Sequence, residues 1–131
     1  MILLGMPPAP PVTATAPASV AAMRWHKRVL LISASDADDP RLVEQRGMLR
    51  AWRTGAEDRD LVVIEILGDR VIGTGDGADA LRRRYRLPAS GFGVALVGKD
   101  GGVKLRRSRP VDAAMLAETI DAMPMRRAGG R

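Results

Sequence analysis

The chain contains no cysteine, and its aromatic residues are limited to two Trp, one Tyr and one Phe among 131 residues. Without cysteine it has no disulfide, no thiolate metal ligand, no iron–sulfur cluster and no thiol redox chemistry of its own. Scarce aromatics also disfavour a base-stacking surface for single-stranded nucleic acid. A core of this composition is expected to be aliphatic.

Lysine is almost as scarce, because only Lys27, Lys99 and Lys104 contribute to the 21 basic residues. Arginine therefore carries the net charge of +6, and its planar fork suits carboxylate and phosphate better than lysine does. This charge favours acidic partners through long-range attraction. A GC-rich genome produces the same arginine bias, so composition alone selects no partner.

Residues 1–23 are rich in Pro, Ala and Thr and carry no charge, so we expect a disordered tail without a core. Small residues at 13–22 are typical of a signal-peptidase site, and the tail is either a signal-peptide remnant or a linker. The apolar run at residues 1–6 is too short to span a membrane. We therefore predict no membrane span, and a periplasmic or secreted protein, or a cytoplasmic one if the tail is uncleaved.

The hydrophobic pattern of residues 24–127 predicts a single α/β domain, followed by a flexible C-terminus at 128–131. Asp39 and Asp112 are predicted helix caps, and Asp100-Gly101 predicts a tight hairpin turn with positive φ at both residues. The predicted elements are a strand at 29–33, a helix from 40 to about 53, a strand at 60–67 with 71–72 as a candidate extension, a helix at 76–86, strands at 94–97 and 103–107, and a helix from 112 to Pro124. This order, β-α-β-α-β-β-α, predicts a thioredoxin-like fold with a mixed sheet flanked by helices.

Five segments give the chain a family resemblance. They are Arg28-Val29-Leu30-Leu31, Asp39-Pro40-Arg41 with Gln45, the stretch from Glu57 to Val63, the stretch from Gly98 to Arg106, and the stretch from Ile120 to Arg127. From about Trp25 to Arg127 the chain resembles the bacterial family catalogued as domain of unknown function 4174. The resemblance implies a thioredoxin-like domain related to peroxiredoxins and to a domain repeated in some secreted vertebrate matrix proteins. It brings no established activity.

A degenerate active-site corner is expected at Ser33, Ser35 and Asp36, where thioredoxin-like enzymes carry a reactive cysteine before the first helix. A serine hydroxyl is too weak an acid to replace a thiolate without a positioned base. Gly93 stands where thioredoxins carry a cis-proline. We therefore assign no catalytic residue, and a degenerate peroxiredoxin-like enzyme, or an accessory protein acting with a partner's thiol, remains the alternative. A hydrolytic Ser35 would need His26, which the strand direction places at the opposite end.

Two further patterns point to cofactors, but only weakly. Asp36, Asp38 and Asp39 offer oxygen ligands, yet the spacing lacks the glycine and distal glutamate of a calcium loop. Residues 73–78 fit the pattern G-x-G-x-x-A of dinucleotide-binding turns, but Asp76 places a negative charge where phosphate would lie. We expect no metal and no cofactor.

The candidate binding residues are cationic and lie near the end of the chain. They are Lys99, Lys104, Arg106, Arg107, Arg126 and Arg127. Lys104 and Arg106 are predicted to share a strand face, with the Arg pair just after the last helix. These residues form either one basic face for an acidic protein or polyanion, or ordinary protection of a strand edge and a helix end. The leading hypothesis is a non-catalytic binding module; specific nucleic-acid binding is disfavoured because no motif supports it.

Overall fold

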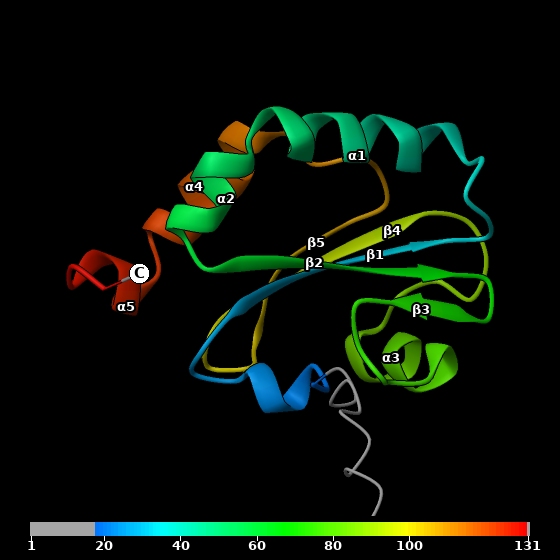
Figure 1. The fold of residues 1–131 in the computed structure, drawn as a ribbon, viewed down its shortest axis with the longest axis horizontal. Coiled ribbons are helices and arrows are strands. Elements are labelled where there is room, and N and C mark those ends of the chain that lie inside the picture. Colours follow the sequence, from blue (N-terminus) through cyan, green and yellow to red (C-terminus); the bar gives the residue numbers. More distant parts are fainter. Residues whose placement is uncertain (1–17, 131) are drawn as a thin grey trace, which may run out of the picture.

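The computed structural model describes residues 18–130, which form one five-stranded sheet with the order β3-β2-β1-β4-β5 (Figure 1). β1 and β2 are parallel, and every other neighbouring pair is antiparallel. The elements are a 3₁₀ turn η1 (Ala21–Met23), β1 (Arg28–Ala34), α1 (Pro40–Ala51), α2 (Arg53–Asp58), β2 (Leu61–Leu67), β3 (Arg70–Ile72), α3 (Ala78–Tyr85), β4 (Gly93–Val97), β5 (Val103–Arg107), α4 (Ala113–Asp121) and α5 (Pro124–Arg127). The predicted mixed α/β architecture is confirmed, and it is consistent with a thioredoxin-like fold.

Helices cover both faces of the sheet: α1, α2 and α4 lie on one face, and α3 with η1 lies on the other (Figure 1). Every residue of β1 is buried, as expected for a strand between two helical layers. Leu30 and Ile32 pack with Leu42, Leu116 and Ile120 under α1 and α4. Val29 and Leu31 pack instead with the α3 layer, which includes Leu81, Tyr85 and Val20.

The helix caps follow the sequence pattern. Asp39 accepts a hydrogen bond from the Arg41 amide at 2.9 Å, with Pro40 in the first turn of α1. Asp112 caps α4 by accepting from the Met115 amide at 2.8 Å. The predicted first helix ends at Ala51, because Trp52 leaves helical geometry at φ −113° and ψ 22°, and a second helix, α2, follows that the sequence did not predict.

Three boundaries differ from the predicted ones. α3 begins after Gly77 rather than at residue 76, because the Asp76 carboxylate accepts from the Val20 amide at 2.8 Å. Val20, which lies in the predicted tail at residues 1–23, is buried. Residues 1–17 of that tail and the terminal Arg131 lie outside the described residues. Pro124 starts the short helix α5, so Arg126 and Arg127 lie within a helix rather than after one.

The hairpin between β4 and β5 also differs from its prediction. Gly101 has φ +87°, whereas Asp100 does not adopt positive φ. The strand register shifts within the pair, so that Leu96 opposes Leu105 while Val97 opposes Val103. Lys104 is the extra residue of this β-bulge, and the two-residue alternation breaks there.

Within residues 18–130, no helix has both the length and the apolar character needed to cross a bilayer.

Candidate functional site

The structure distributes the six predicted cations over two ends of the sheet. The hairpin end is where β1 begins, beside the turn at residues 98–102 and α5; the corner end is where β1 finishes, beside residues 33–36, the start of β4 and the end of β5. Lys99, Lys104, Arg126 and Arg127 belong to the hairpin end, whereas Arg106 and Arg107 belong to the corner end. The six cations therefore do not lie on one face, although one basic face was among the alternatives that the sequence left open.

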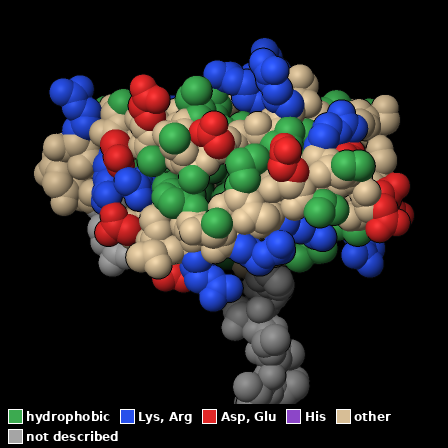
Figure 2. Space-filling view, turned by 90° about the horizontal axis from the view of Figure 1, so that it is seen from above, with side chains coloured by type: hydrophobic (Ala, Val, Ile, Leu, Met, Phe, Trp, Pro, Cys, Tyr) green, Lys and Arg blue, Asp and Glu red, His purple; other side chains and the backbone are tan. Residues whose placement is uncertain are grey.

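The β-bulge explains part of this separation. Arg106 reaches the α3 layer and donates to the Tyr85 carbonyl oxygen at 3.0 Å, whereas Lys104 lines a cavity with Met123 and Met125 of the α4–α5 segment. A regular strand would have placed both side chains on one face. On the face that carries α1, basic and acidic side chains are interspersed (Figure 2).

At the hairpin end, three of the predicted cations form salt bridges with acidic residues of the same chain: Lys99, Lys104 and Arg126. Lys99, only 8% exposed, lies 2.9 Å from Asp60, and Lys104 lies 2.8 Å from Asp100. The hydrogen bond from Lys104 lowers the pKa of the Asp100 carboxyl below its usual range. These lysines stabilise the hairpin and offer little free charge.

Arg126 is held in the same way. Its guanidinium lies 2.6 Å from Asp58 and 3.1 Å from Asp121, and the hydrogen bond to Asp58 is the main cause that raises the pKa of Arg126. Arg59 also donates to both carboxylate oxygens of Asp121 and, more than Arg126, lowers the pKa of Asp121. Arg127 is exposed.

Arg28 lies at the centre of these contacts, and sequence reasoning missed it as a candidate. Its side chain is fully buried and donates to the Arg59 carbonyl oxygen at 2.7 Å and to the Met123 sulfur at 3.3 Å. Its Nη2 has no hydrogen-bond partner among the described residues. Burial, and after it the charge of Arg126, lowers the pKa of Arg28. The available signal was an arginine opening an otherwise apolar strand.

At the corner end, Ser33 is buried and accepts from Arg82 Nε at 2.9 Å. Arg82, itself buried on α3, also donates to the carbonyl oxygens of Gly68, Ala34 and Ile66. The Ser33 hydroxyl therefore orients a guanidinium that joins the ends of β1 and β2. It is not exposed to a substrate.

The other corner residues do not converge with a base. Ser35 is exposed and accepts from the Gly91 amide at 3.1 Å, and Asp36 accepts from the Asp38 amide. His26 is exposed before the start of β1, whereas Ser35 follows its end. Seven strand residues separate them, or roughly 23 Å. The structure thus brings together neither a triad nor a Ser–His pair.

The candidate cofactor positions have local roles. The Asp39 carboxylate accepts hydrogen bonds from the backbone amide and the guanidinium of Arg41, and the side-chain hydrogen bond lowers the pKa of Asp39. Asp76 anchors Val20 instead of facing an open turn. Within the described part of the chain, no three acidic or histidine side chains are grouped as metal ligands.

An open cavity of about 510 Å³ at the corner end collects arginines that the sequence had not grouped. We call it the arginine cleft; its lining residues are Arg86, Leu87, Pro88, Phe92, Gly93, Arg106, Arg107 and Ser108. Among these described residues none is acidic. Arg86 ends α3 in the left-handed conformation at φ +55°, which turns the chain toward Pro88. A Cβ on Gly93 would lie 2.5 Å from Pro88 Cδ, so the wall of the cleft requires glycine there.

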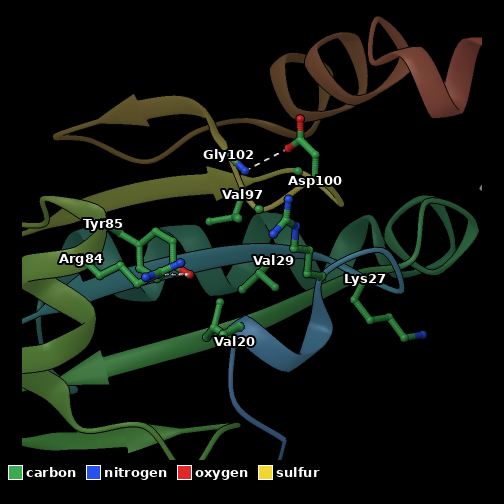
Figure 3. A pocket seen from close by; sticks show the side chains of 12 residues that line it. Val20, Lys27, Val29, Arg84, Tyr85, Val97, Asp100 and Gly102 are labelled. Carbon is green, nitrogen blue, oxygen red and sulfur yellow. Dashed lines mark hydrogen bonds between the residues drawn. The ribbon is translucent and has the colours of Figure 1, made fainter.

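A second cavity, of about 400 Å³, lies between η1, α3 and the hairpin turn (Figure 3). Val20, Val29 and Val97 point toward its middle, while the Lys27 side chain points away (Figure 3). Its rim carries Arg24 and Arg84 but also Asp100. This mixture of charges gives it less selectivity for anions than the arginine cleft has.

Comparison with curated proteins and with solved structures finds no match to the chain. The model of the family described as Domain of unknown function (DUF4174) matches residues 19–129, a span that contains all five strands and both ends of the sheet. The chain therefore belongs to the DUF4174 family.

Proposed function

We propose that this protein is a non-catalytic binding module that takes acidic side chains of a partner protein into the arginine cleft. The observation that supports this most strongly is the cleft's lining, which has three arginines and no acidic residue among the described residues. Binding would bring the missing negative charge from outside.

Hydrogen bonds within the chain orient two of these arginines without neutralising them. Arg106 donates to the Tyr85 carbonyl oxygen and Arg107 to the Arg106 carbonyl oxygen, at 3.0 and 2.8 Å. A carbonyl oxygen supplies no counter-charge, so a carboxylate is still attracted to both guanidinium groups. Arginine forks can bind a carboxylate with two parallel hydrogen bonds, and the exposed position of the three side chains leaves them accessible.

The cleft also has an apolar wall, formed by Leu87, Pro88 and Phe92. Arg41 lies over the Phe92 ring at 5.5 Å, but Asp39 pairs with its guanidinium, so it adds no free charge to the cleft. An acidic peptide with an apolar residue beside its carboxylates complements both features. A free sugar-phosphate polymer would use the charge and leave the apolar wall uncovered.

An accessory role with a partner's thiol and a location outside the cytoplasm are the two other predictions made from the sequence. Ser33 is engaged by Arg82, and no specific observation favours an accessory role with a partner's thiol. A periplasmic or secreted location likewise remains a prediction.

The test is fluorescence anisotropy with a labelled peptide that contains Asp, Glu and Phe, beside the same peptide with Asn and Gln in place of the acids. We expect binding of the acidic peptide alone, weakening as salt rises because exposed charges are screened. The variant Arg86→Asn/Arg107→Ala should raise its Kd at least about tenfold, the loss of one to two charge-assisted hydrogen bonds. Asn is chosen because it tolerates left-handed backbone at residue 86.

The matched control is Arg50→Ala/Arg53→Ala, which removes the same charge from exposed positions on α1 and α2. Its Kd should change less than twofold. An equal loss in both variants would show that only net charge matters and would refute the cleft. Tight binding of heparin with no binding of the acidic peptide would assign the surface to polyanions and refute a protein partner.

A further inference from the structure

We propose that the hairpin end holds a second, separate binding site, in which Arg28 binds the carboxylate of a small amphipathic acid. The site is a cavity of about 270 Å³, which we call the Arg28 cavity. It does not depend on the arginine cleft, because the two cavities share no lining residue and lie at opposite ends of the sheet.

The first argument is the unsatisfied donor of Arg28. A buried polar group without a hydrogen-bond partner is costly to a fold, and a buried charge is costlier still. Arg28 lines the cavity, is 0% exposed, and has an Nη2 with no acceptor among the described residues. One carboxylate oxygen would supply an acceptor and a counter-charge together.

The nearby acids do not meet this need. Asp60 and Asp121 are close enough to favour the charged form of Arg28, but neither is hydrogen-bonded to it. Asp60 is bound to Lys99, and Asp121 to Arg59 and Arg126. Burial and the positive charge of Arg126 together outweigh these acids and lower the pKa of Arg28. None of these carboxylates therefore satisfies the free Nη2 of Arg28.

The second argument is apolar. Trp25 is 55% exposed and Met125 is 42% exposed, and both line the same cavity beside the buried Met123. Exposed apolar side chains gathered in one place, rather than scattered singly, mark a contact surface. Methionine adapts its shape to different apolar ligands.

The backbone at Trp25 supports the same conclusion. Trp25 has φ +73°, a conformation that is strained for a bulky residue and is often found at ligand sites. Its amide donates to the Lys99 carbonyl oxygen, which holds the backbone of Trp25 beside the cavity, and the Arg24 guanidinium lies over the indole at 4.9 Å. The strain maintains an exposed aromatic wall that the fold itself does not bury.

These features together define the class of ligand. A charged head binds Arg28, and an aliphatic body lies against Trp25 and the two methionines. Asp100 also lines the cavity, but Lys104 pairs with it at 2.8 Å. The volume is just under the range of about 300–1,000 Å³ usual for drug-sized ligands. A short aliphatic carboxylic acid fits this description better than a nucleotide does.

The experiment compares three probes by isothermal titration with the full chain: octanoate, acetate and octanol. Octanoate has both the charge and the chain, whereas each of the others has only one. We expect octanoate to bind at least about tenfold more tightly than either, the loss expected for one charge-assisted hydrogen bond or two buried methylene groups. Equal binding of octanol would refute the carboxylate contact, and equal binding of acetate would refute the apolar wall.

Two variants locate the site. Arg28→Met removes the charge and keeps an unbranched side chain, and it should raise the Kd for octanoate about tenfold or more. Arg53→Met makes the same change at an exposed position on α2 and should leave the Kd within about twofold. Octanoate binding unchanged in Arg28→Met would overturn the proposal.

A third variant covers the case in which Arg28→Met does not fold. Met125→Glu places a carboxylate on an exposed position of the apolar wall, where it repels octanoate without entering the core. Its Kd should also rise about tenfold, and octanoate should no longer raise the melting temperature as mass action requires of a native-state ligand. Unchanged binding in this variant would place octanoate elsewhere and overturn the proposal.

Discussion

The two ends of the sheet each bury an arginine, but they treat it differently. At the corner end, Arg82 donates to the Ser33 hydroxyl and to three carbonyl oxygens, so its donors are well used. At the hairpin end, Arg28 has one carbonyl oxygen and one sulfur, and its Nη2 has no partner among the described residues. The guanidinium buried at the corner end is thus satisfied within the chain, whereas the one at the hairpin end keeps an unused donor.

The exposed charges show the reverse distribution. At the hairpin end, lysines and Arg126 are paired with Asp58, Asp60, Asp100 and Asp121. At the corner end, Arg106 and Arg107 donate to carbonyl oxygens. The number of cations in a segment is therefore a poor guide to free charge, because the fold decides which of them meet a carboxylate.

The largest effect is expected for Arg82→Met. The substitution leaves a buried hydroxyl and several carbonyl oxygens without their donor, and each orphaned group costs about 1–3 kcal/mol. We expect the free energy of unfolding to fall by about 3 kcal/mol, measured by urea denaturation. Arg83→Met, an exposed position on the same helix, should stay within about 0.5 kcal/mol. Similar losses in both variants would contradict the role of the Arg82 hydrogen bonds in joining the ends of β1 and β2.

The two serines of the corner give a smaller effect. Ser33→Ala leaves the Nε of buried Arg82 without its acceptor at 2.9 Å and should cost about 1.5 kcal/mol. Ser35→Ala removes a hydrogen bond at an exposed position and should cost about 0.5 kcal/mol or less. Urea denaturation of the two variants measures both losses in the free energy of unfolding. If Ser35→Ala proves the more harmful, then Ser35 and not Ser33 is the structural residue of the corner.

Arg28→Met should be tolerated better than Arg82→Met, which sharpens the contrast between the ends. It removes a hydrogen bond to the Arg59 carbonyl oxygen but also a buried charge that the surroundings satisfy only in part, and apolar replacements at such sites are often mild. We expect a loss of about 1 kcal/mol by the same measurement. A loss as large as that of Arg82→Met would mean that the hairpin end already satisfies its arginine.

Sequence reasoning predicted the fold well, because the elements are fixed by local chemistry. The buried strands appear as apolar runs, and Asp39 and Asp112 are helix caps that the sequence shows directly. The hairpin was located correctly, but its turn type was not, since the register shift beside Lys104 depends on packing against both layers.

The site was predicted less well, because it depends on residues far apart in the sequence. Arg106 was identified, but its neighbour in the cleft, Arg86, lies 20 positions earlier and comes close only through the α3 turn at φ +55°. Arg126 was also identified, yet its partner Asp58 is 68 positions away. Pattern and composition carry no information on such pairings. The number of basic residues in a segment therefore could not predict where the folded protein exposes unpaired positive charge.

The smallest expected effect is on the pH dependence of stability. It compares Asp121, which is paired at the hairpin end, with an exposed carboxylate on α1. Hydrogen bonds from Arg59 and Arg126 lower the pKa of Asp121 in the folded protein. A lowered carboxyl pKa contributes stability that is present above the unfolded value, near 3.9, and is lost as pH falls through the folded value. Because Asp121 is partly exposed, the contribution is small.

Asp121→Asn should therefore be less stable than the wild type at pH 7, and the difference should shrink below about pH 4. The control Glu44→Gln, at an exposed position on α1, should match the wild type at each pH. Thermal denaturation from pH 7 to 3 measures both, and a difference that stays constant with pH would show that Asp121 acts through shape rather than charge.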